Sequence, residues 1–453
     1  TGQQPAIFTG PLYTIYKAIT TLKAADELER RHGKPVVPIF WVGSEDHDFE
    51  EARRTHFLTK DHRTLTVDYA PQADIAARPM YRVPLEGSLR ECIDRAADAV
   101  AGSECRKCVR EALHETFDAA DSLSDWTARL LAYLFRDTRL LFYAPHLPQG
   151  RRCAAAILER EIRNPSATTA CINDAAQRLD AAGFPPQLVK QPDECNFFIE
   201  VDGRRRKVVH EGARFTLPET RTHYSERDLL DLLIAEPERF SPNVALRCVV
   251  QQHLFPVAAY VAGPGELAYW AELKEVFGRH ELPMPIVYPR ARAVLTTVKL
   301  NQIRERLGVD LPALMGDPQA LHERVLRFTS KSPAYATTQK HRPKIDALLD
   351  KLAREVAHED AVAANMVHGL RRTVDHKLAR IERRVLYEEE VRNGAAGKQL
   401  ERLRVALAPE RKPQERYYNV FSFLFEQGWE LIPRLIDALD IHSFDMTEVE
   451  LAP

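Results

Sequence analysis

The sequence predicts an α/β protein with a parallel-sheet core and a C-terminal α-helical coiled-coil domain. Two alternations of helix and buried strand predict the core, one in the first sixty residues and one after residue 255. A long apolar repeat with spacings of three and four residues, from Ile345 to Val385, predicts the coiled coil. A chain of 453 residues is long enough for two or three domains with sizeable cores.

The first alternation begins with a polar loop and a helix. In "TGQQPAIFTGPLYTIYKAITTLKAADELERRHG", apolar residues recur at helical spacing from Ile15 to Leu28, and Gly33 provides a C-terminal stop. The run "KPVVPIFWVG" is typical of a strand buried on both faces, and "SEDHDFEE" follows at its carboxyl end. Because ligands of open α/β sheets bind at the carboxyl ends of the strands, this order predicts a ligand site there.

The α/β core is expected to span residues 1–296. It includes a mostly helical insertion at about 65–137, after which "LLFYAPH" is expected to form another strand. The second alternation, "FPVAAYVAGPGELAYWAELKEVFGRHELPMPIVYPRA", has a strand, a Gly-Pro-Gly turn, a helix and a strand that ends at Arg290. The α/β character therefore continues to the end of this segment.

Residues 297–453 are expected to form the helical domain, with its coiled-coil seam at about 343–390. Breaks near Glu359–Asp360, at Gly369 and at "RNGAAG" favour an antiparallel hairpin over one rod. We expect this hairpin to be a dimerisation arm, although a solvated helix pair that packs only on itself is the alternative. The apolar C-terminal helical segment after "QERYYNVFSFLF" is expected to pack back onto the core.

Composition narrows the class of protein. The 63 basic and 65 acidic residues give a net charge of −2, which argues against a general binder of nucleic acid or membrane surfaces. No apolar run reaches the roughly 18 residues of a membrane span, and no secretory signal is present. Seven scattered cysteines favour reduced thiols in a cytoplasmic protein. Because Cys105 and Cys108 have no second pair at zinc spacing, no metal is predicted. The chain opens inside a motif, so we expect that residues before Thr1 are missing.

Three turns could hold an anion at backbone N–H groups: the opening loop with Gly2 and Gly10, the acidic loop, and "GPGE" at residues 263–266. Lys17, one or two turns into the first helix, could reach a phosphate or carboxylate there, or could be an ordinary surface lysine. Arg290 could clamp a carboxylate bidentately, or form a salt bridge within the protein.

The acidic loop contains Asp46, His47 and Asp48 in a row. A histidine flanked by carboxylates can act as a general base with raised basicity, and the same residues can bind a divalent metal. A solvated acidic turn that caps a helix is the structural alternative. Since no P-loop, G-x-S-x-G or G-x-G-x-x-G motif occurs at these turns, the residues alone indicate an α/β enzyme with an anionic ligand.

Four blocks carry a resemblance over essentially the whole chain. "TGQQPAIFTGPLYTIYKAITTLKAADEL", "PVVPIFWVGSEDHDFEE", "VAGPGELAYWAELKEVFGRHELPMPIVYPRA" and "QERYYNVFSFLF" together resemble the bacillithiol-biosynthesis family BshC. The resemblance implies a Rossmann-like core, a coiled-coil domain and a cysteine ligase that adds L-cysteine to glucosaminyl malate in the last step of bacillithiol synthesis. The family's motifs fall on Thr1, Gly2, Gln3, Gln4, Gly10, Pro11, Tyr13 and Lys17, on Glu45, Asp46, His47, Asp48 and Phe49, and on Gly263, Pro264 and Glu266.

The sequence departs from the family in a few places. Arg53 and Arg54 stand where an asparagine is usual, Cys248 and Gln252 stand where proline and aspartate are expected, and the several dozen residues that precede the "TGQQ" block are absent. These differences leave open the alternative that the chain is a relative of the family that acts on another amine acceptor.

The resemblance implies that the cysteine carboxylate is activated, with ATP as the cofactor, before the amine attacks. The nucleotide or acyl phosphate is expected over the opening loop, with Lys17 offsetting its charge. His47, flanked by Asp46 and Asp48, is expected to be the base, and Arg290 to hold the malyl carboxylate. The expected partners are these small molecules and a second copy of the chain. A metal-dependent hydrolase using Asp46, His47, Asp48 and His56, or a non-enzymatic coiled-coil scaffold, are the alternatives.

Overall fold

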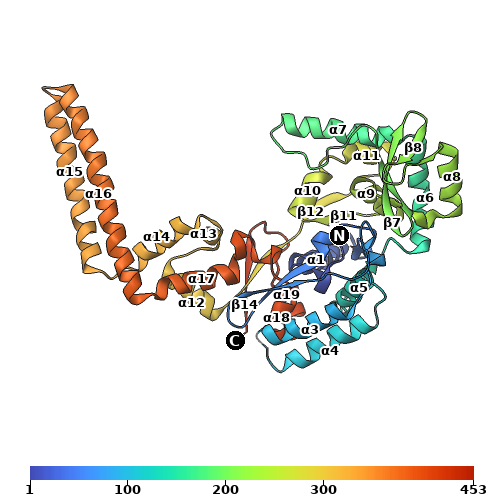
Figure 1. Cartoon of the computed structure of the whole chain (residues 1–453), viewed down its shortest axis with the longest axis horizontal. Coiled ribbons are helices and arrows are strands. Elements are labelled where there is room, and N and C mark those ends of the chain that lie inside the picture. The colour runs from blue at the N-terminus through green and yellow to red at the C-terminus, as the bar shows by residue number, and fades with distance from the viewer. Residues whose placement is uncertain (101, 453) are drawn as a thin grey trace. The chain divides into compact units, whose positions relative to one another are not determined.

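The computed structural model describes residues 1–100 and 102–452 (Figure 1). The chain forms two compact units. The first combines Thr1–Val294 with Glu415–Val449, and the second consists of Leu295–Gln414 and the last residues from Glu450. The C-terminal segment that the sequence placed with the helical domain is thus mostly part of the first unit.

Parallel strands form the centre of the first unit, as the sequence predicted. The strands β1 (Gly2–Gln3), β2 (Ile39–Val42) and β5 (Leu141–Tyr143) make a parallel sheet in the order β1-β2-β5. A second parallel pair joins β11 (Ala259–Ala262) and β12 (Ile286–Pro289). The buried helix α1 (Tyr13–His32) connects β1 to β2 and ends at Gly33, which takes the left-handed conformation (φ 62°) of a helix C-cap. The α/β fold class is confirmed.

Most of the described residues in 65–137, where the helical insertion was expected, are helical, but the segment between β2 and β5 also contains an antiparallel hairpin. The hairpin pairs β3 (Arg54–Leu58) with β4 (Thr64–Asp68). The helical elements of this segment are α2 (Phe49–Ala52), η2 (Met80–Arg82), α3 (Gly87–Ala99), α4 (Cys105–Asp118) and α5 (Leu123–Leu134).

A five-stranded antiparallel sheet follows β5, and the sequence analysis made no prediction for it. Its order is β10-β6-β7-β8-β9. The turn Asp202-Gly203 joins β6 to β7 with positive φ angles of 52° and 70°, and Asp-Gly is a sequence signal for such hairpins. The elements of this region are α6 (Pro148–Arg163), α7 (Pro165–Ala181), β6 (Glu194–Val201), β7 (Arg204–Glu211), β8 (Arg214–Leu217), β9 (Thr222–Tyr224), α8 (Glu226–Ala235), η3 (Pro237–Arg239), β10 (Phe240–Pro242) and α9 (Val244–Leu254).

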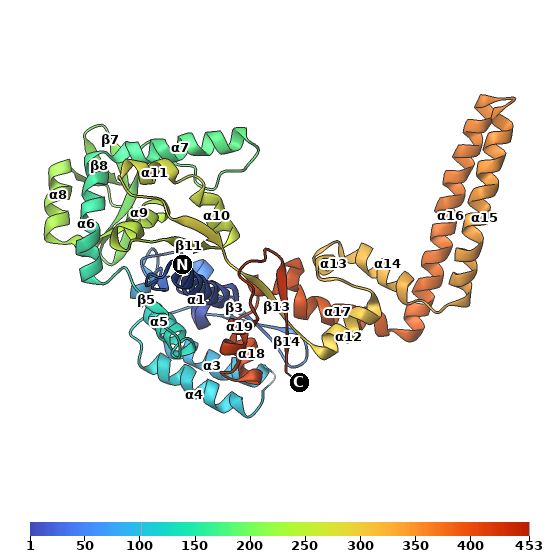
Figure 2. The same cartoon turned by 180° about the vertical axis from the view of Figure 1, so that it is seen from behind.

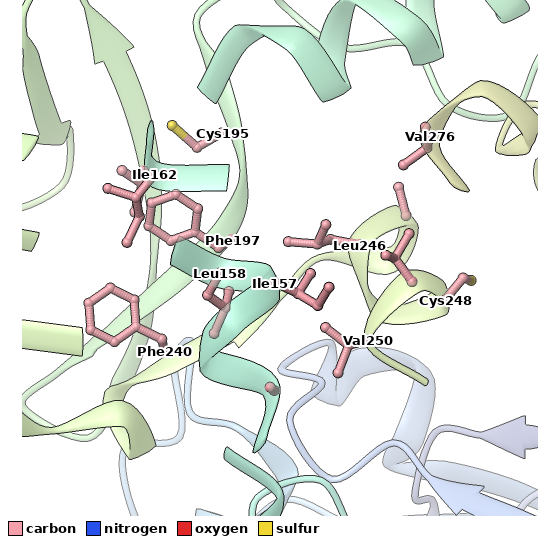
Figure 3. Close-up of a cluster of buried hydrophobic side chains, with 14 of the residues drawn as sticks. Ile157, Leu158, Ile162, Cys195, Phe197, Phe240, Leu246, Cys248, Val250 and Val276 are labelled. Atoms are coloured by element: carbon pink, nitrogen blue, oxygen red, sulfur yellow. The ribbon is translucent and has the colours of Figure 1, made fainter. Parts of the chain in front are cut away.

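A buried apolar cluster anchors this sheet and α9 (Figure 3). Phe197 of β6 and Phe240 of β10 meet Leu158 of α6, all fully or almost fully buried. Leu246 and Cys248 of α9 belong to the same cluster. Burial of each of these side chains contributes about 1.5–3 kcal/mol and fixes the orientation of α9. Arg247, which lies between Leu246 and Cys248 in the sequence, is thereby held in position as well.

The rest of the first unit comes from both sides of the helical domain in the sequence. Strands β13 (Arg292–Thr297) and β14 (Met446–Leu451) carry the chain across the boundary between the units. In the first unit, α18 packs on α4 and on α19, and α19 contacts α1. The helices are α10 (Pro264–Trp270), α11 (Lys274–Arg279), α18 (Phe421–Gln427) and α19 (Leu431–Ala438).

The second unit is helical. Its long helices α15 (Pro333–Ala357) and α16 (Ala361–Asn393) form an antiparallel hairpin, as predicted, and lie side by side in both views (Figures 1 and 2). Asp360 caps α16 by accepting from the amides of Val362 and Ala363. The expected break at Gly369 is absent, because a helix interior tolerates an isolated glycine at a cost of about 1 kcal/mol. The other elements are α12 (Val298–Leu307), α13 (Leu311–Met315), α14 (Pro318–Thr329), α17 (Ala395–Leu407) and the short turns η4 (Pro409–Arg411) and η5 (Gln414–Arg416), the last of which reaches into the first unit.

The apolar repeat of the hairpin does not form one internal seam. Ala353, Ala364 and Leu386 are buried, whereas several residues of the predicted seam are exposed. The exposed apolar side chains of the two helices are Leu348, Leu352, Val362, Met366, Leu370, Ile381, Tyr387 and Val391. In the described part of the chain, no helix has the length and apolar composition that crossing a membrane requires.

Candidate functional site

A cavity of about 530 Å³ lies in the first unit, where the parallel strands end. Its wall includes Gln3 at the end of β1 and Gln4 after it, Gly43 and Asp46 after β2, and Gly263 to Glu266 after β11. Tyr13 and Lys17 reach it from α1, and Arg290 reaches it from the end of β12. Nine of the fourteen predicted site residues therefore line one cavity, at the sheet edge where the strand order placed them.

Lys17 lies at the base of this cavity and is only 3% exposed, so it is no surface lysine. Its Nζ donates to the carbonyl oxygen of Gly2 and to Oε1 of Gln3, each at 2.9 Å, and forms an ion pair with Glu266. Burial lowers the pKa of Lys17, while the Glu266 charge opposes this shift. The first helix, the strand β1 and the glycine turn are thereby joined through one buried ammonium group.

Glu266 has two hydrogen-bond partners besides its ion pair with Lys17. It accepts from the amide of Gly263 at 2.8 Å and from the hydroxyl of Tyr260 at 2.7 Å. Burial pushes its pKa up, but the Lys17 charge and these hydrogen bonds outweigh that effect and hold the pKa of Glu266 below its usual value. A Cβ atom on Gly263 would come within 3.3 Å of the Glu266 carboxylate, which explains the glycine at this turn. Pro264 opens α10 at its first position, where no backbone donor is lost.

Arg290 also lines the cavity, but its guanidinium is already engaged. It forms a buried bidentate pair with Glu415, with N–O distances of 2.9 and 2.7 Å. Glu415 accepts from the amide of Ala293 as well. The structure therefore shows the internal salt bridge and not a free clamp, which argues against Arg290 as the main holder of a substrate carboxylate.

Gly10 and Pro11 do not reach the cavity, contrary to the prediction of an anion cradle at the start of α1. The amide of Leu12 donates to the carbonyl of Tyr418 at 2.9 Å. Asn419 donates to the carbonyls of Phe8 and Gly10, each at 2.7 Å. The tight turn, in which Gly10 has φ 74°, is thus closed by a distant segment.

The acidic loop divides between the cavity and the protein interior. Asp46 lines the cavity. Glu45, 6% exposed, instead forms an ion pair with buried Arg151 at 3.0 Å. Asp48 caps α2 by accepting from the amide of Glu51, and its carbonyl accepts from Gln4 at 2.7 Å. Asp48 therefore caps a helix, which is the structural role that the sequence left open for this loop. The contacts of Glu45 and Asp48 hold the loop in the position that brings Asp46 to the cavity.

His47 is not among the residues that line the cavity, and it is not the basic group that its flanking carboxylates suggested. Its Nδ1 lies 3.2 Å from Nη1 of Arg205, and its ring packs against Phe198. Burial and the Arg205 charge lower the pKa of His47 and outweigh Asp46 and Asp48. Because a guanidinium only donates, Nδ1 must accept, and the proton of the neutral ring is on Nε2. The prediction that the flanking carboxylates raise the pKa of His47 is therefore wrong.

The cavity also contains residues that the sequence analysis did not select. Arg247 donates to the hydroxyl of Tyr269 at 2.9 Å, and both side chains line the cavity with Tyr260. Glu51 is the last residue of the acidic "SEDHDFEE" stretch, and Arg416 lies in the "QERYY" block. Both positions lie within blocks that carried the resemblance, which was the available signal.

The metal-hydrolase alternative has no ligand set. Across the residues that the structure describes, no three His, Cys, Asp or Glu side chains are grouped as a metal ion requires. Nδ1 of His56 lies 3.0 Å from Oγ1 of Thr66, and its ring stacks on Tyr417. Cys108 donates its thiol to the carbonyl of Cys105 within one helical turn.

Comparison with known proteins agrees with this architecture. Residues 1–291 match the family model described as "Bacillithiol biosynthesis BshC, N-terminal Rossmann-like domain", and residues 293–451 match "Bacillithiol biosynthesis BshC, C-terminal coiled-coil domain". Similar proteins include three named "Putative cysteine ligase BshC". The protein from Salinibacter ruber is 33% identical over 97% of this chain and 80% of its own length. Those from Geobacillus thermodenitrificans (32%; 96% and 80%) and Symbiobacterium thermophilum (30%; 98% and 82%) are close behind.

Proposed function

This chain belongs to the bacillithiol biosynthesis BshC family, and from that membership we propose that it is a ligase that joins L-cysteine to the amine of glucosaminyl malate. The observation that supports this function most directly is the cavity that gathers nine predicted residues from the three motif blocks. Amide formation from a carboxylate requires activation, and ATP is the proposed co-substrate that would supply it as an acyl adenylate or acyl phosphate. This reaction would belong in the cytoplasm, and all seven cysteines are free thiols, which fits a reducing compartment.

The cavity contains groups for both charge changes of this reaction, the negative charge that the activated substrate brings and the proton that the attacking amine releases. Arg247 and Arg416 would offset most of the negative charge of phosphate and carboxylate groups, and Lys17 and Arg290, which are paired with Glu266 and Glu415, would contribute less. The carboxylates Asp46 and Glu51 face the same space, and a carboxylate there would take the proton that the attacking amine must lose. His47, held by Arg205, would orient the acidic loop and so place Asp46.

The function is tested by incubating the purified chain with L-cysteine, glucosaminyl malate and ATP. We expect the amide product by mass spectrometry, together with ADP or AMP, and no product when ATP is omitted. The nucleotide product would also show which acyl group is formed. Absence of product under all conditions would contradict the ligase. A non-enzymatic scaffold would in addition show no thermal shift with any of the three compounds, because a ligand stabilises only the state that binds it.

We also propose that the hairpin of α15 and α16 makes a homodimer. The supporting observation is its exposed apolar side chains, among them Met366 at 72% and Leu370 at 49%. Met366→Glu is expected to weaken dimerisation at least about tenfold, since it buries a charge at an apolar interface. Light scattering after size-exclusion chromatography measures this, with Lys351→Glu at an exposed position as the control. A wild-type chain that stays monomeric would refute the dimer.

A further inference from the structure

Two arginines of the cavity have no carboxylate partner. Arg416 forms no ion pair in the part of the chain that the structure describes, and its side chain is exposed. Arg247 donates to neutral groups, such as the hydroxyl of Tyr269 and Oε1 of Gln251 at 3.1 Å. The other two cations, by contrast, are each paired with a carboxylate of the protein. An incoming anion would meet uncompensated positive charge at Arg416 and Arg247.

Arg416 is held at the cavity by its neighbour in the chain. Glu415 is 1% exposed, and its carboxylate binds Arg290 and the amide of Ala293. The backbone at Arg416 is therefore anchored, while its guanidinium stays open to the cavity. Binding a carboxylate there breaks no existing ion pair, and a guanidinium can hold a carboxylate by two parallel hydrogen bonds.

Two carboxylates of the same cavity also lack a cation. Asp46 and Glu51 form no ion pair among the described residues. The carboxylate of Asp46 accepts from the amide of Asp48, at 3.1 Å. Partial burial, followed by the charges of Asp48 and Asp46, raises the pKa of Glu51. A ligand cation placed beside Glu51 and Asp46 would relieve this repulsion.

The positive and negative groups act on one region of the cavity. Tyr13, Arg416 and Glu51 line the same cavity. Burial raises the pKa of the Tyr13 phenol, while the Arg416 charge opposes this shift and the Glu51 charge adds to it. The cavity therefore contains both a cationic and an anionic pole.

From these contacts we infer that the cavity binds a single molecule that carries both an ammonium group and a carboxylate, with the carboxylate on Arg416 and the ammonium on Asp46 and Glu51. This inference rests on the proposed function and names the recognition in its site. Two of the proposed substrates have this chemistry. L-Cysteine carries both groups on one carbon, whereas glucosaminyl malate carries its amine on the sugar and its carboxylates on the malyl group.

Titration calorimetry on the full chain tests the inference, with L-cysteine and glucosaminyl malate as separate ligands. Arg416→Met and Glu51→Gln are each expected to weaken binding of the same ligand at least about tenfold, as expected for loss of a charge-assisted contact. That ligand is the one recognised at both poles. Arg416→Lys is expected to lose less than Arg416→Met, because it keeps the charge. If the ligand is L-cysteine, then cysteamine, which has only the ammonium group, and 3-mercaptopropionate, which has only the carboxylate, are each expected to bind at least about tenfold more weakly.

Matched controls separate charge in the cavity from charge in general. Glu50→Gln removes a carboxylate that is adjacent in sequence but 77% exposed and paired with Arg53, and Arg31→Met removes an arginine that is 68% exposed on α1. Both are expected to leave the affinities unchanged within about twofold, since exposed pairs contribute little. Unchanged melting temperatures in all variants would show that they are folded.

Several results would overturn the inference. These are a wild-type chain that binds neither ligand, variants at the two poles that weaken different ligands, and variants that weaken none. Amide formation with unchanged affinities in both variants would overturn the inference alone. The expected losses of affinity without any amide product would overturn the proposed ligase reaction alone.

Discussion

Replacing Lys17 by methionine is expected to lower the free energy of unfolding by about 3–5 kcal/mol, because it leaves the buried Glu266 carboxyl group without its ion pair. The variant also removes the donor to the Gly2 carbonyl and to Gln3, so three segments of the cavity lose their common partner. Chemical denaturation followed by circular dichroism measures the loss. We expect ligase activity to fall with it.

The double variant Lys17→Met with Glu266→Gln separates charge from packing. Since removal of both charges leaves no uncompensated ion, it is expected to regain most of the stability that the single variant loses. Lys34→Met, at an exposed lysine just after α1, is expected to change stability by no more than about 0.5 kcal/mol. A single variant as stable as the wild type would show that the buried ion pair does not hold the cavity together.

Replacing Asp46 by asparagine is expected to lower kcat of amide formation about 100-fold or more. Among Asp46, His47 and Asp48, it is Asp46 that lines the cavity. Removal of a general base lowers the rate about 10²–10⁴-fold. Asparagine has almost the same shape, and its side-chain oxygen can still accept from the amide of Asp48. Loss of activity with an unchanged melting temperature would therefore report the charge and not the fold.

His47→Gln is the matched comparison for Asp46→Asn. Since Nδ1 of His47 accepts from Arg205, a glutamine oxygen can retain this contact, and we expect a smaller loss of kcat than in Asp46→Asn. The opposite order, with His47→Gln inactive and Asp46→Asn active, would restore His47 as the base. Steady-state kinetics of both variants with saturating ATP decides between the two.

Local patterns predicted much of the fold. The apolar run before Gly43 forms β2, the segment after Gly263 forms α10, and a helical hairpin turns at Asp360. These elements follow from periodicity, from glycine and proline positions and from a helix cap, all of which are encoded within a few residues. The antiparallel sheet was not predicted, although the Asp202-Gly203 turn marked one of its hairpins.

The order of helices and strands along the chain predicts which strand ends meet, because parallel strands present their carboxyl ends at one edge. This rule predicted the placement of Asp46 and Gly263 at one cavity, which Lys17 reaches from α1. What these groups do depends on tertiary contacts. Arg205 takes His47 out of the site and Glu415 neutralises Arg290, and both partners lie more than 100 residues away in the chain. Protonation and free charge depend on burial and on such distant partners, and neither is visible in a local pattern.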